Sequence, residues 1–298
     1  MKKLLMVGLL LTAAIALQAQ MKVAPKMQKG AVKTYVGQST VSIPMQGDVK
    51  VSDETKYTVV DATVDGYVID LETVNVQAEC DANNIAGKLL VAAQETMKGI
   101  VFRIGLDKDG KIQKLLNSDE VQPKLTKGLE SIVDQFMKDI PQLSAAVSKD
   151  DLMKQIVESI TPDALLETFQ EATSPFSLNG KTIITGAQEE YVSKDGMKMK
   201  RMYFVQGKNI VANSTLNMTK DEMKEMIIKQ VEKSAPDQAA MVKENIDQIM
   251  SSGMLKMDMK ETATYELQDD GWVKSIKGES TTESMGQKIV KTSTVTLK

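Results

Sequence analysis

Apolar and polar side chains alternate with a period of two residues over much of residues 31–78. The apolar positions in the clearest part of this stretch are Tyr57, Val59, Tyr67, Ile69 and Leu71. Asp65-Gly66 interrupts the alternation with a residue pair typical of a hairpin turn. Near Thr73 the apolar parity shifts by one residue, which indicates a bulge. The stretch is therefore predicted to be an antiparallel meander of strands.

A spacing of three to four residues replaces this alternation over residues 118–173 and predicts amphipathic helices. Pro141 and Pro162 divide the stretch into about three of them. Thr161 supplies a capping hydroxyl directly before Pro162, as at the start of many helices. A further short helix is expected over residues 83–97. Its predicted packed face consists of Leu89, Leu90, Ala93 and Met97.

A second helical block is predicted from Thr219 to Ser251. Thr219 and Glu222 have the spacing of a capping box, in which each side chain bonds to the backbone of the other residue. Ala235-Pro236 is expected to end one helix and begin the next, because proline is tolerated in the first turn.

Strands are predicted on either side of these helical blocks. The stretches 182–185, 191–192, 202–205 and 209–216 are short and rich in β-branched and aromatic residues. In residues 255–267 the apolar side chains occupy alternate positions: Leu255, Met257, Met259, Ala263, Tyr265 and Leu267. Asp109-Gly110 and Asp270-Gly271 are typical of tight turns, and Gly286 separates a final Thr-rich strand. The fold class predicted is α+β: a long antiparallel curved sheet, or an incomplete β-barrel, with two inserted helical blocks.

The first nineteen residues have the pattern of a signal peptide. Lys2 and Lys3 precede an apolar run from Leu4 to Leu17, which is shorter than the ~20 residues that span a bilayer. Cleavage is expected after Ala19. We therefore expect an exported protein, periplasmic or extracellular, that is soluble after cleavage and has no integral membrane segment.

Residues 20–298 are predicted to form a single α+β domain, with a possible pseudo-repeat of halves 31–175 and 176–298. Arg103 with Gly110 and Arg201 with Gly207 each lie in a strand, turn, strand and helix sequence. Chance similarity between two hairpins explains the same pattern, so both interpretations stay open.

Composition removes several classes of chemistry. The chain has no histidine and one cysteine, Cys80, so histidine-based triads, histidine-ligated zinc and an internal disulfide are excluded. Loss of Lys2 and Lys3 with the signal changes the net charge from −3 to −5, which gives no attraction to nucleic acids. No cofactor, metal site or catalytic residue is predicted, although a hydrolase that uses carboxylates remains an open alternative.

Methionine is unusually abundant, with twenty in the chain and eleven of them between Met197 and Met259. Three interpretations compete. Methionine fills irregular cores, it lines adaptable ligand cavities, and its thioether binds soft metals such as Cu(I). The third interpretation rests on the spacings Met197-x-Met199-x-x-Met202 and Met254-x-x-Met257-x-Met259.

The candidate ligand-binding residues follow from the second interpretation and from the scarcity of arginine. They are Met223, Met226, Met257, Met259, Tyr265, Arg103 and Arg201. The two arginines are the only ones in the chain, and guanidinium suits bidentate binding of a carboxylate or phosphate. A structural ion pair is the competing interpretation for both.

Three short segments carry a resemblance to known proteins: Leu17–Gln20, the hairpin Leu106–Ile112 and the turn Tyr265–Trp272. Together they resemble uncharacterised secreted proteins of the Bacteroidota, which implies an envelope location and supplies no catalytic residues. The strand-helix-strand plan is also similar to LolA- and LppX-type lipoprotein or lipid carriers. In those carriers, helices close one side of an incomplete barrel.

The sequence therefore leads to two hypotheses. In the first, this is a non-enzymatic exported envelope protein that binds a hydrophobic ligand, lipid or lipoprotein-like, between sheet and helices. In the second, it is a scaffold or protein-interaction protein with a packed core and no small ligand. A lipid, another hydrophobic ligand or a protein is the expected partner, and a nucleic acid is not.

Overall fold

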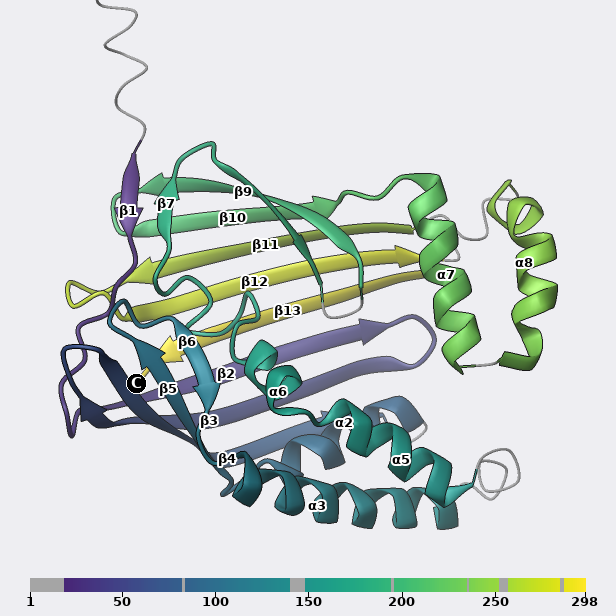
Figure 1. Cartoon of the computed structure of the whole chain (residues 1–298), viewed down its shortest axis with the longest axis horizontal. Coiled ribbons are helices and arrows are strands. Elements are labelled where there is room, and N and C mark those ends of the chain that lie inside the picture. The colour runs from purple at the N-terminus through teal and green to yellow at the C-terminus, as the bar shows by residue number, and fades with distance from the viewer. Residues whose placement is uncertain are drawn as a thin grey trace, which may run out of the picture.

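The computed structural model describes residues 19–81, 84–139, 148–193, 196–234, 236–251, 257–284 and 287–298. The expected signal segment up to residue 18 lies outside these residues, as do Met254, Leu255 and Gly286. Within them, eleven strands form one antiparallel sheet that is open between its edge strands (Figure 1). The predicted α+β fold with a long curved antiparallel sheet is confirmed.

Two meanders make up the sheet. The N-terminal meander contains β2 (Val32–Ile43), β3 (Gly47–Ala62), β4 (Gly66–Cys80), β5 (Val101–Asp107) and β6 (Ile112–Leu115). The C-terminal meander contains β8 (Gln188–Val192), β9 (Lys198–Gln206), β10 (Asn209–Leu216), β11 (Met257–Leu267), β12 (Val273–Ser284) and β13 (Gln287–Leu297). Pairing of β2 with β13, which places Gly37 beside Val295, joins the two meanders into one sheet.

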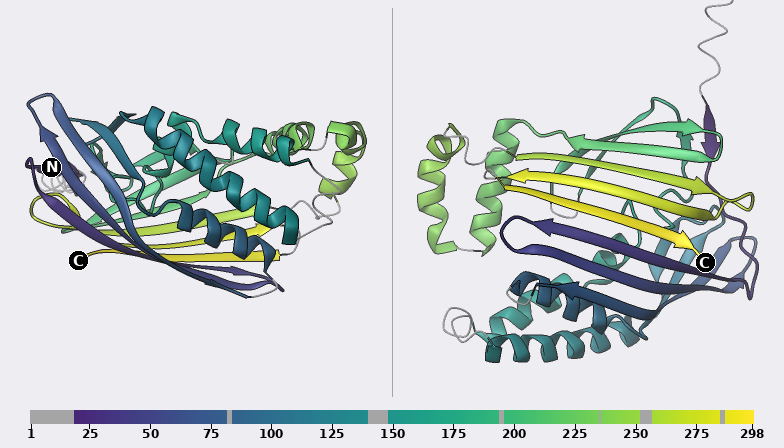
Figure 2. Two further views of the ribbon diagram at one scale, coloured as in Figure 1. Left: turned by 90° about the horizontal axis from the view of Figure 1, so that it is seen from below. Right: turned by 180° about the vertical axis from the view of Figure 1, so that it is seen from behind.

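Most of the helices lie on one side of the sheet, which we call its inner face (Figure 2). They are α2 (Ile85–Thr96), α3 (Ser118–Asp139), α5 (Lys149–Ser159) and α6 (Pro162–Thr168). α7 (Lys220–Ser234) and α8 (Pro236–Ser251) pack on each other at the end of the sheet where β10 ends and β11 begins. None of the helices in the described part of the chain is long and apolar enough to cross a membrane.

A second, two-stranded sheet joins the start of the described chain to its middle. β1 (Gln20–Lys22) pairs with β7 (Thr182–Ile184), and the Ala19 carbonyl accepts a further hydrogen bond from the Thr185 amide at 2.9 Å. The alternation pattern predicted β7 and gave no signal for β1.

Several local sequence signals produce the structures they predict. The Thr219 hydroxyl accepts a hydrogen bond from the Glu222 amide at 3.2 Å, and the Glu222 carboxylate accepts one from the Thr219 amide at 2.8 Å. This is the predicted capping box, and α7 begins at the next residue. The Thr161 hydroxyl caps α6 by accepting from the Ala164 amide. The predicted bulge is also present, since Val74 has no partner between the pairs at Thr73 and Asn75.

The expected packed face of α2 is partly wrong. Leu89 and Leu90 are 40% and 37% exposed, and the helix instead approaches the sheet through Gly87. A Cβ at Gly87 would lie 2.8 Å from the Cys80 Cβ and 2.9 Å from a Val49 methyl carbon. The absent side chain therefore lets the helix backbone pack directly on β3 and β4.

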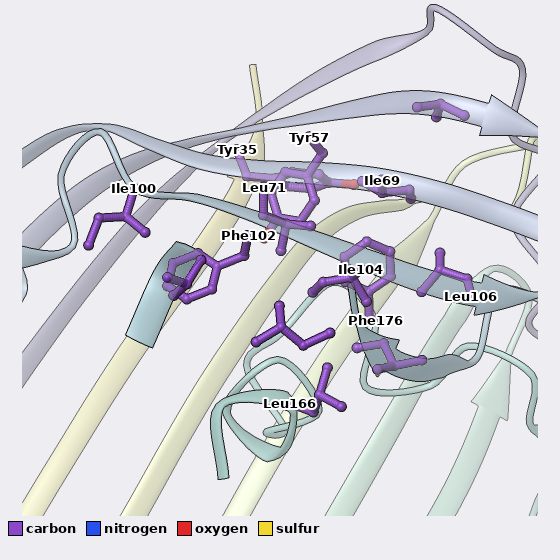
Figure 3. Close-up of a cluster of buried hydrophobic side chains, with 14 of the residues drawn as sticks. Tyr35, Tyr57, Ile69, Leu71, Ile100, Phe102, Ile104, Leu106, Leu166 and Phe176 are labelled. Carbon is purple, nitrogen blue, oxygen red and sulfur yellow. The ribbon is translucent and has the colours of Figure 1, made fainter. Parts of the chain in front are cut away.

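Two hydrophobic clusters fill the end of the inner face farthest from α7. The first is centred on β2 to β5 and includes Tyr35, Tyr57, Leu71, Phe102, Ile104, Leu166 and Phe176 (Figure 3). The second lies on β9 to β12 and includes Leu178, Tyr203, Ile210, Tyr265 and Ile276. Burying each such side chain contributes about 1.5–3 kcal/mol, so this end of the sheet is the stable core.

The segment between α6 and β7, residues 169–181, crosses the inner face between these clusters and contributes Phe176 to one and Leu178 to the other. Small side chains in the strands below make room for it. A Cβ at Gly278 would lie 3.0 Å from the Thr173 methyl carbon. The crossing segment therefore separates the packed core from the half of the inner face nearer α7.

Candidate functional site

Beyond the crossing segment, polar side chains form a row across six strands of the inner face. The strand register places each member beside the next, in the order Glu189, Arg201, Ser214, Glu261, Ser280 and Lys291. We call this set the charged row. Its members occupy positions whose parity elsewhere on the same strands is apolar, as in Met199 and Tyr203 on either side of Arg201. The row therefore faces inward, toward the helices.

Arg201 is held by its neighbours in this row. Its Nε donates to the Ser214 hydroxyl at 2.9 Å, and a terminal nitrogen lies 3.6 Å from the Glu261 carboxylate. The guanidinium also stacks 4.3 Å from the centroid of the Tyr191 ring. Only 11% of the Arg201 side chain is exposed, so its charge is neutralised inside the protein.

Glu189 is also paired internally. Lys181 donates to both of its carboxylate oxygens at 2.8 and 2.9 Å, and the Tyr203 hydroxyl donates to one at 2.6 Å. Burial alone would raise the pKa of Glu189, but these hydrogen bonds outweigh it and lower that pKa. Glu189 therefore stays ionised as part of a structural network.

Lys291 differs from the other charged members of the row. It is half-buried at the β13 position beside Ser280 and Val41, and no ion pair or hydrogen bond of its ammonium group occurs among the described residues. The three charged neighbours on its own face are paired without it. Lys291 is thus an uncompensated cation on the inner face.

The next row toward α7 is mostly apolar. Its members are Tyr191, Met199, Leu216, Met259, Thr282 and Ile289. We call this set the apolar row; β10 and β11 pair at Thr215 and Lys260, which brings Leu216 beside Met259. Met199 is buried, Met259 is half-buried and Ile289 is 38% exposed. The row is therefore covered near β9 and open toward β13.

A cleft of about 270 Å³ lies between β2, β3 and β13 on one side and α2, α6 and the crossing segment on the other. Lys291 lines it, together with Ser39, Asp53, Thr55, Gln94, Phe169, Glu171, Thr173 and Ser293. Pockets for small ligands usually measure about 300–1,000 Å³. The cleft therefore suits one end of a ligand, and its lining is mainly polar.

Asp53 is a half-buried acidic group in this cleft. Desolvation raises its pKa, and the Thr55 hydroxyl, which donates to its carboxylate at 3.1 Å, opposes that rise. Its position depends on Gly37 of β2, where a Cβ would lie 2.3 Å from the Asp53 Oδ1 atom. The carboxylate therefore occupies the space that a side chain at residue 37 would fill.

The structure brings the four candidate methionines to one end of the sheet. Met257 and Met259 begin β11 on its inward parity, and Met223 and Met226 lie in α7, which follows the end of the neighbouring strand β10. All four are half-buried. None of them lines the cleft, and Lys291, which does, is two residues from Ile289 of the apolar row on β13.

The remaining candidate residues lie elsewhere. Tyr265 is fully buried in the second cluster, and its hydroxyl donates to the Ala172 carbonyl at 2.6 Å. Arg103 projects from the face opposite Phe102 and Ile104 and makes a bidentate pair with Asp70 at 2.7 and 2.8 Å. In this structure both arginines therefore form ion pairs.

The methionine spacings do not converge on one face. Met199 is on the inner face, whereas Met202 has the opposite parity on β9, and Met254 lies outside the described residues. Across the described ranges, no group of three or more Asp, Glu or Cys side chains is arranged to hold a metal ion.

Sequence reasoning missed Asp53 and Lys291. Each is a charged residue at an otherwise apolar parity, Asp53 between Val51 and Thr55 and Lys291 between Ile289 and Ser293. A charge that interrupts an inward-facing set of positions is the signal that would have identified both.

Comparisons with known proteins leave the family open. No family model and no curated protein matches the chain. A structure of lipovitellin, described by its lipid-protein interactions, is similar with a TM-score of 0.39 and 11% identity. That match covers 92% of this chain, which spans only 25% of the lipovitellin chain. A porin-like protein from Bacteroides uniformis has a TM-score of 0.19 and 9% identity, with 91% of this chain and 97% of that chain covered.

Proposed function

We propose that this chain is an exported, non-enzymatic binding protein that holds an amphipathic ligand on the inner face of its sheet. The ligand's polar end would lie in the cleft, and its hydrophobic part would lie along the apolar row toward α7. This retains a hydrophobic ligand between sheet and helices, and it moves the centre of the site from Tyr265 to the strands β2, β3 and β13.

One observation supports the proposal above all others: the inner face is open near β13, and its chemistry changes from polar to apolar there. Lys291 and the hydroxyl-lined cleft lie on one side, and Met259 and Ile289 lie one row away. A packed scaffold core would bury the inward side chains of these strands. Here Ile289 is 38% exposed.

The arrangement of acidic groups also favours binding over catalysis. Glu261 and Glu189, which face inward, are bound to Arg201 and Lys181 respectively. A general acid or base needs a group free to exchange a proton with a substrate. Asp53 is the exception, because it lines the cleft with no cationic partner among the described residues and desolvation raises its pKa.

The first experiment is native mass spectrometry of the protein purified from a bacterial periplasm, repeated after denaturation. A lipid-sized adduct that is lost on denaturation is the expected result. Delipidated protein is then titrated with a dansyl-labelled fatty acid and its methyl ester, both followed by fluorescence.

Two tryptophan substitutions test the location of the site. Ser39→Trp fills the cleft and should abolish binding of both probes. Thr40→Trp adds the same side chain to the opposite face of the same strand and should leave binding unchanged. If neither probe binds wild-type protein and no adduct is found, the inner face is better explained as a contact surface for a protein partner.

A further inference from the structure

Building on the proposed function, we propose that the ligand is a single-chain amphiphile with an anionic head, and that Lys291 binds this head. A long-chain carboxylate is the ligand class to which the proposal commits. The argument uses the charge of the inner face, the shape of the cleft and the position of the apolar row.

The charge argument starts from the pairing within the charged row. Arg201 pairs with Glu261, and Glu189 pairs with Lys181, so these groups offer no net charge to a ligand. Lys291 is half-buried and has no such partner in the described part of the chain. A partly desolvated cation gains most from an anion that completes its hydrogen bonds. The inner face therefore favours a negative head at this position.

The neighbours of Lys291 fit such a head. Ser280 lies directly across on β12, and Ser293 lies two residues further along β13 on the same face. Ser39 faces Ser293 from β2. Their hydroxyls can donate to oxygen atoms of an anion without adding a competing charge. Two acidic residues, Asp53 and Glu171, also line the cleft. An ionised Asp53 would repel an anion, but it is four residues along and two strands across from Lys291, about 16 Å away by strand geometry.

The position of the apolar row indicates the direction in which the ligand's hydrocarbon chain would run. Ile289 is two residues from Lys291 on the same face of β13, with Thr282 and then Met259 beside it. A hydrocarbon chain leaving the head would lie on these side chains and continue toward α7, where Met223 and Met226 are half-buried. The small volume of the cleft, about 270 Å³, favours a compact head such as a carboxylate.

The test compares a charged probe with its neutral counterpart. Wild-type protein should bind 11-(dansylamino)undecanoic acid at least about tenfold more tightly than the methyl ester, since a charge-assisted hydrogen bond accounts for a factor of this order. Lys291→Met keeps the aliphatic part of the side chain and should weaken binding of the acid about tenfold, with the ester changed less than about twofold. Lys291→Arg should restore binding of the acid.

Lys288→Met is the matched control. Lys288 lies on the same strand, is exposed and faces the opposite side of the sheet beside Glu283. Its loss removes the same charge from the protein and should not alter binding of either probe. A thermal melt of each variant checks that the sheet remains folded.

The outcomes separate this proposal from the one on which it rests. If acid and ester bind wild type equally, or if Lys291→Met and Lys288→Met behave alike, the anionic head is wrong while ligand binding stands. If neither probe binds wild-type protein, the proposed ligand-binding function itself is wrong. Inorganic phosphate and decanoate are added as competitors. Competition by decanoate alone supports a single-chain ligand, and equal competition by phosphate overturns it in favour of a free anion.

Discussion

Replacement of Tyr265 by phenylalanine distinguishes an anchor of the core from a ligand contact. The Tyr265 hydroxyl is fully buried and donates to the Ala172 carbonyl at 2.6 Å, which ties the crossing segment to β11. Phenylalanine keeps the ring and removes only this bond, so the buried carbonyl loses its donor. Leaving such a group unsatisfied costs about 1–3 kcal/mol. In proteins of this size each kcal/mol lowers Tm by about 2–4 °C, so Tyr265→Phe should melt several degrees lower.

Thermal unfolding followed by circular dichroism measures this effect, with Tyr67→Phe as the control. Tyr67 is half-buried, and no hydrogen bond of its hydroxyl occurs among the described residues. Tyr67→Phe should therefore change the free energy of unfolding by no more than about 0.5 kcal/mol. The probe titration is repeated on both variants and should show unchanged affinity. Unaltered stability of Tyr265→Phe together with lost probe binding would refute the reasoning and return Tyr265 to the ligand site.

Three further predictions follow from single contacts. Gly87→Ala gains about 1 kcal/mol of helix propensity but crowds Val49 and Cys80, and overpacking costs about 1–3 kcal/mol. Urea unfolding should therefore show a lower free energy of unfolding for this variant, and a higher one would contradict the close packing of α2. Burial raises the pKa of Asp53, so wild-type stability should fall as pH rises from about 3.8 through the pKa of Asp53 in the folded protein. Asp53→Asn should reduce this dependence of stability on pH, and an unchanged dependence would contradict the assignment to Asp53. Hydrogen bonds from Lys198 and the capping box lower the pKa of Glu222 to about 2. The stabilisation of the folded protein by ionised Glu222 should therefore be present above pH 4.5 and fade as pH falls toward 2. Glu222→Gln should remove this part of the loss of stability when unfolding is measured at decreasing pH.

Local signals predicted most of the elements because their causes are local. Asp109-Gly110 forms the turn between β5 and β6, where Gly110 has a φ of +81°. The capping box at Thr219 and the end of α8 at Ser251 match their predicted positions. The short strand β1 had no such signal, since three residues show no period and its partner β7 lies about 160 residues away.

The candidate site was less predictable because it depends on strand register. Periodicity identified the inward parity of Met257 and Met259, and the structure agrees with that parity. It gave no means of knowing that Lys291, Ser280 and Glu261 stand side by side across three strands. Nor did it distinguish Tyr265, eight residues from Met257 on the same parity, as part of the packed core. How deeply a strand residue is buried depends on the elements that cover that part of the strand, and periodicity in the sequence does not reveal them.

The join between β2 and β13 has a consequence for how the chain folds. Gly37 pairs with Val295, roughly 260 positions later, and contacts so distant in sequence form slowly because a long loop must close first. Until they meet, each meander presents a bare edge of unpaired backbone groups, the kind of edge through which sheets of different molecules associate. β2 and β13 are the longer of those edges, at 12 and 11 residues. We therefore expect their union to be the late step that turns two aggregation-prone halves into one sheet.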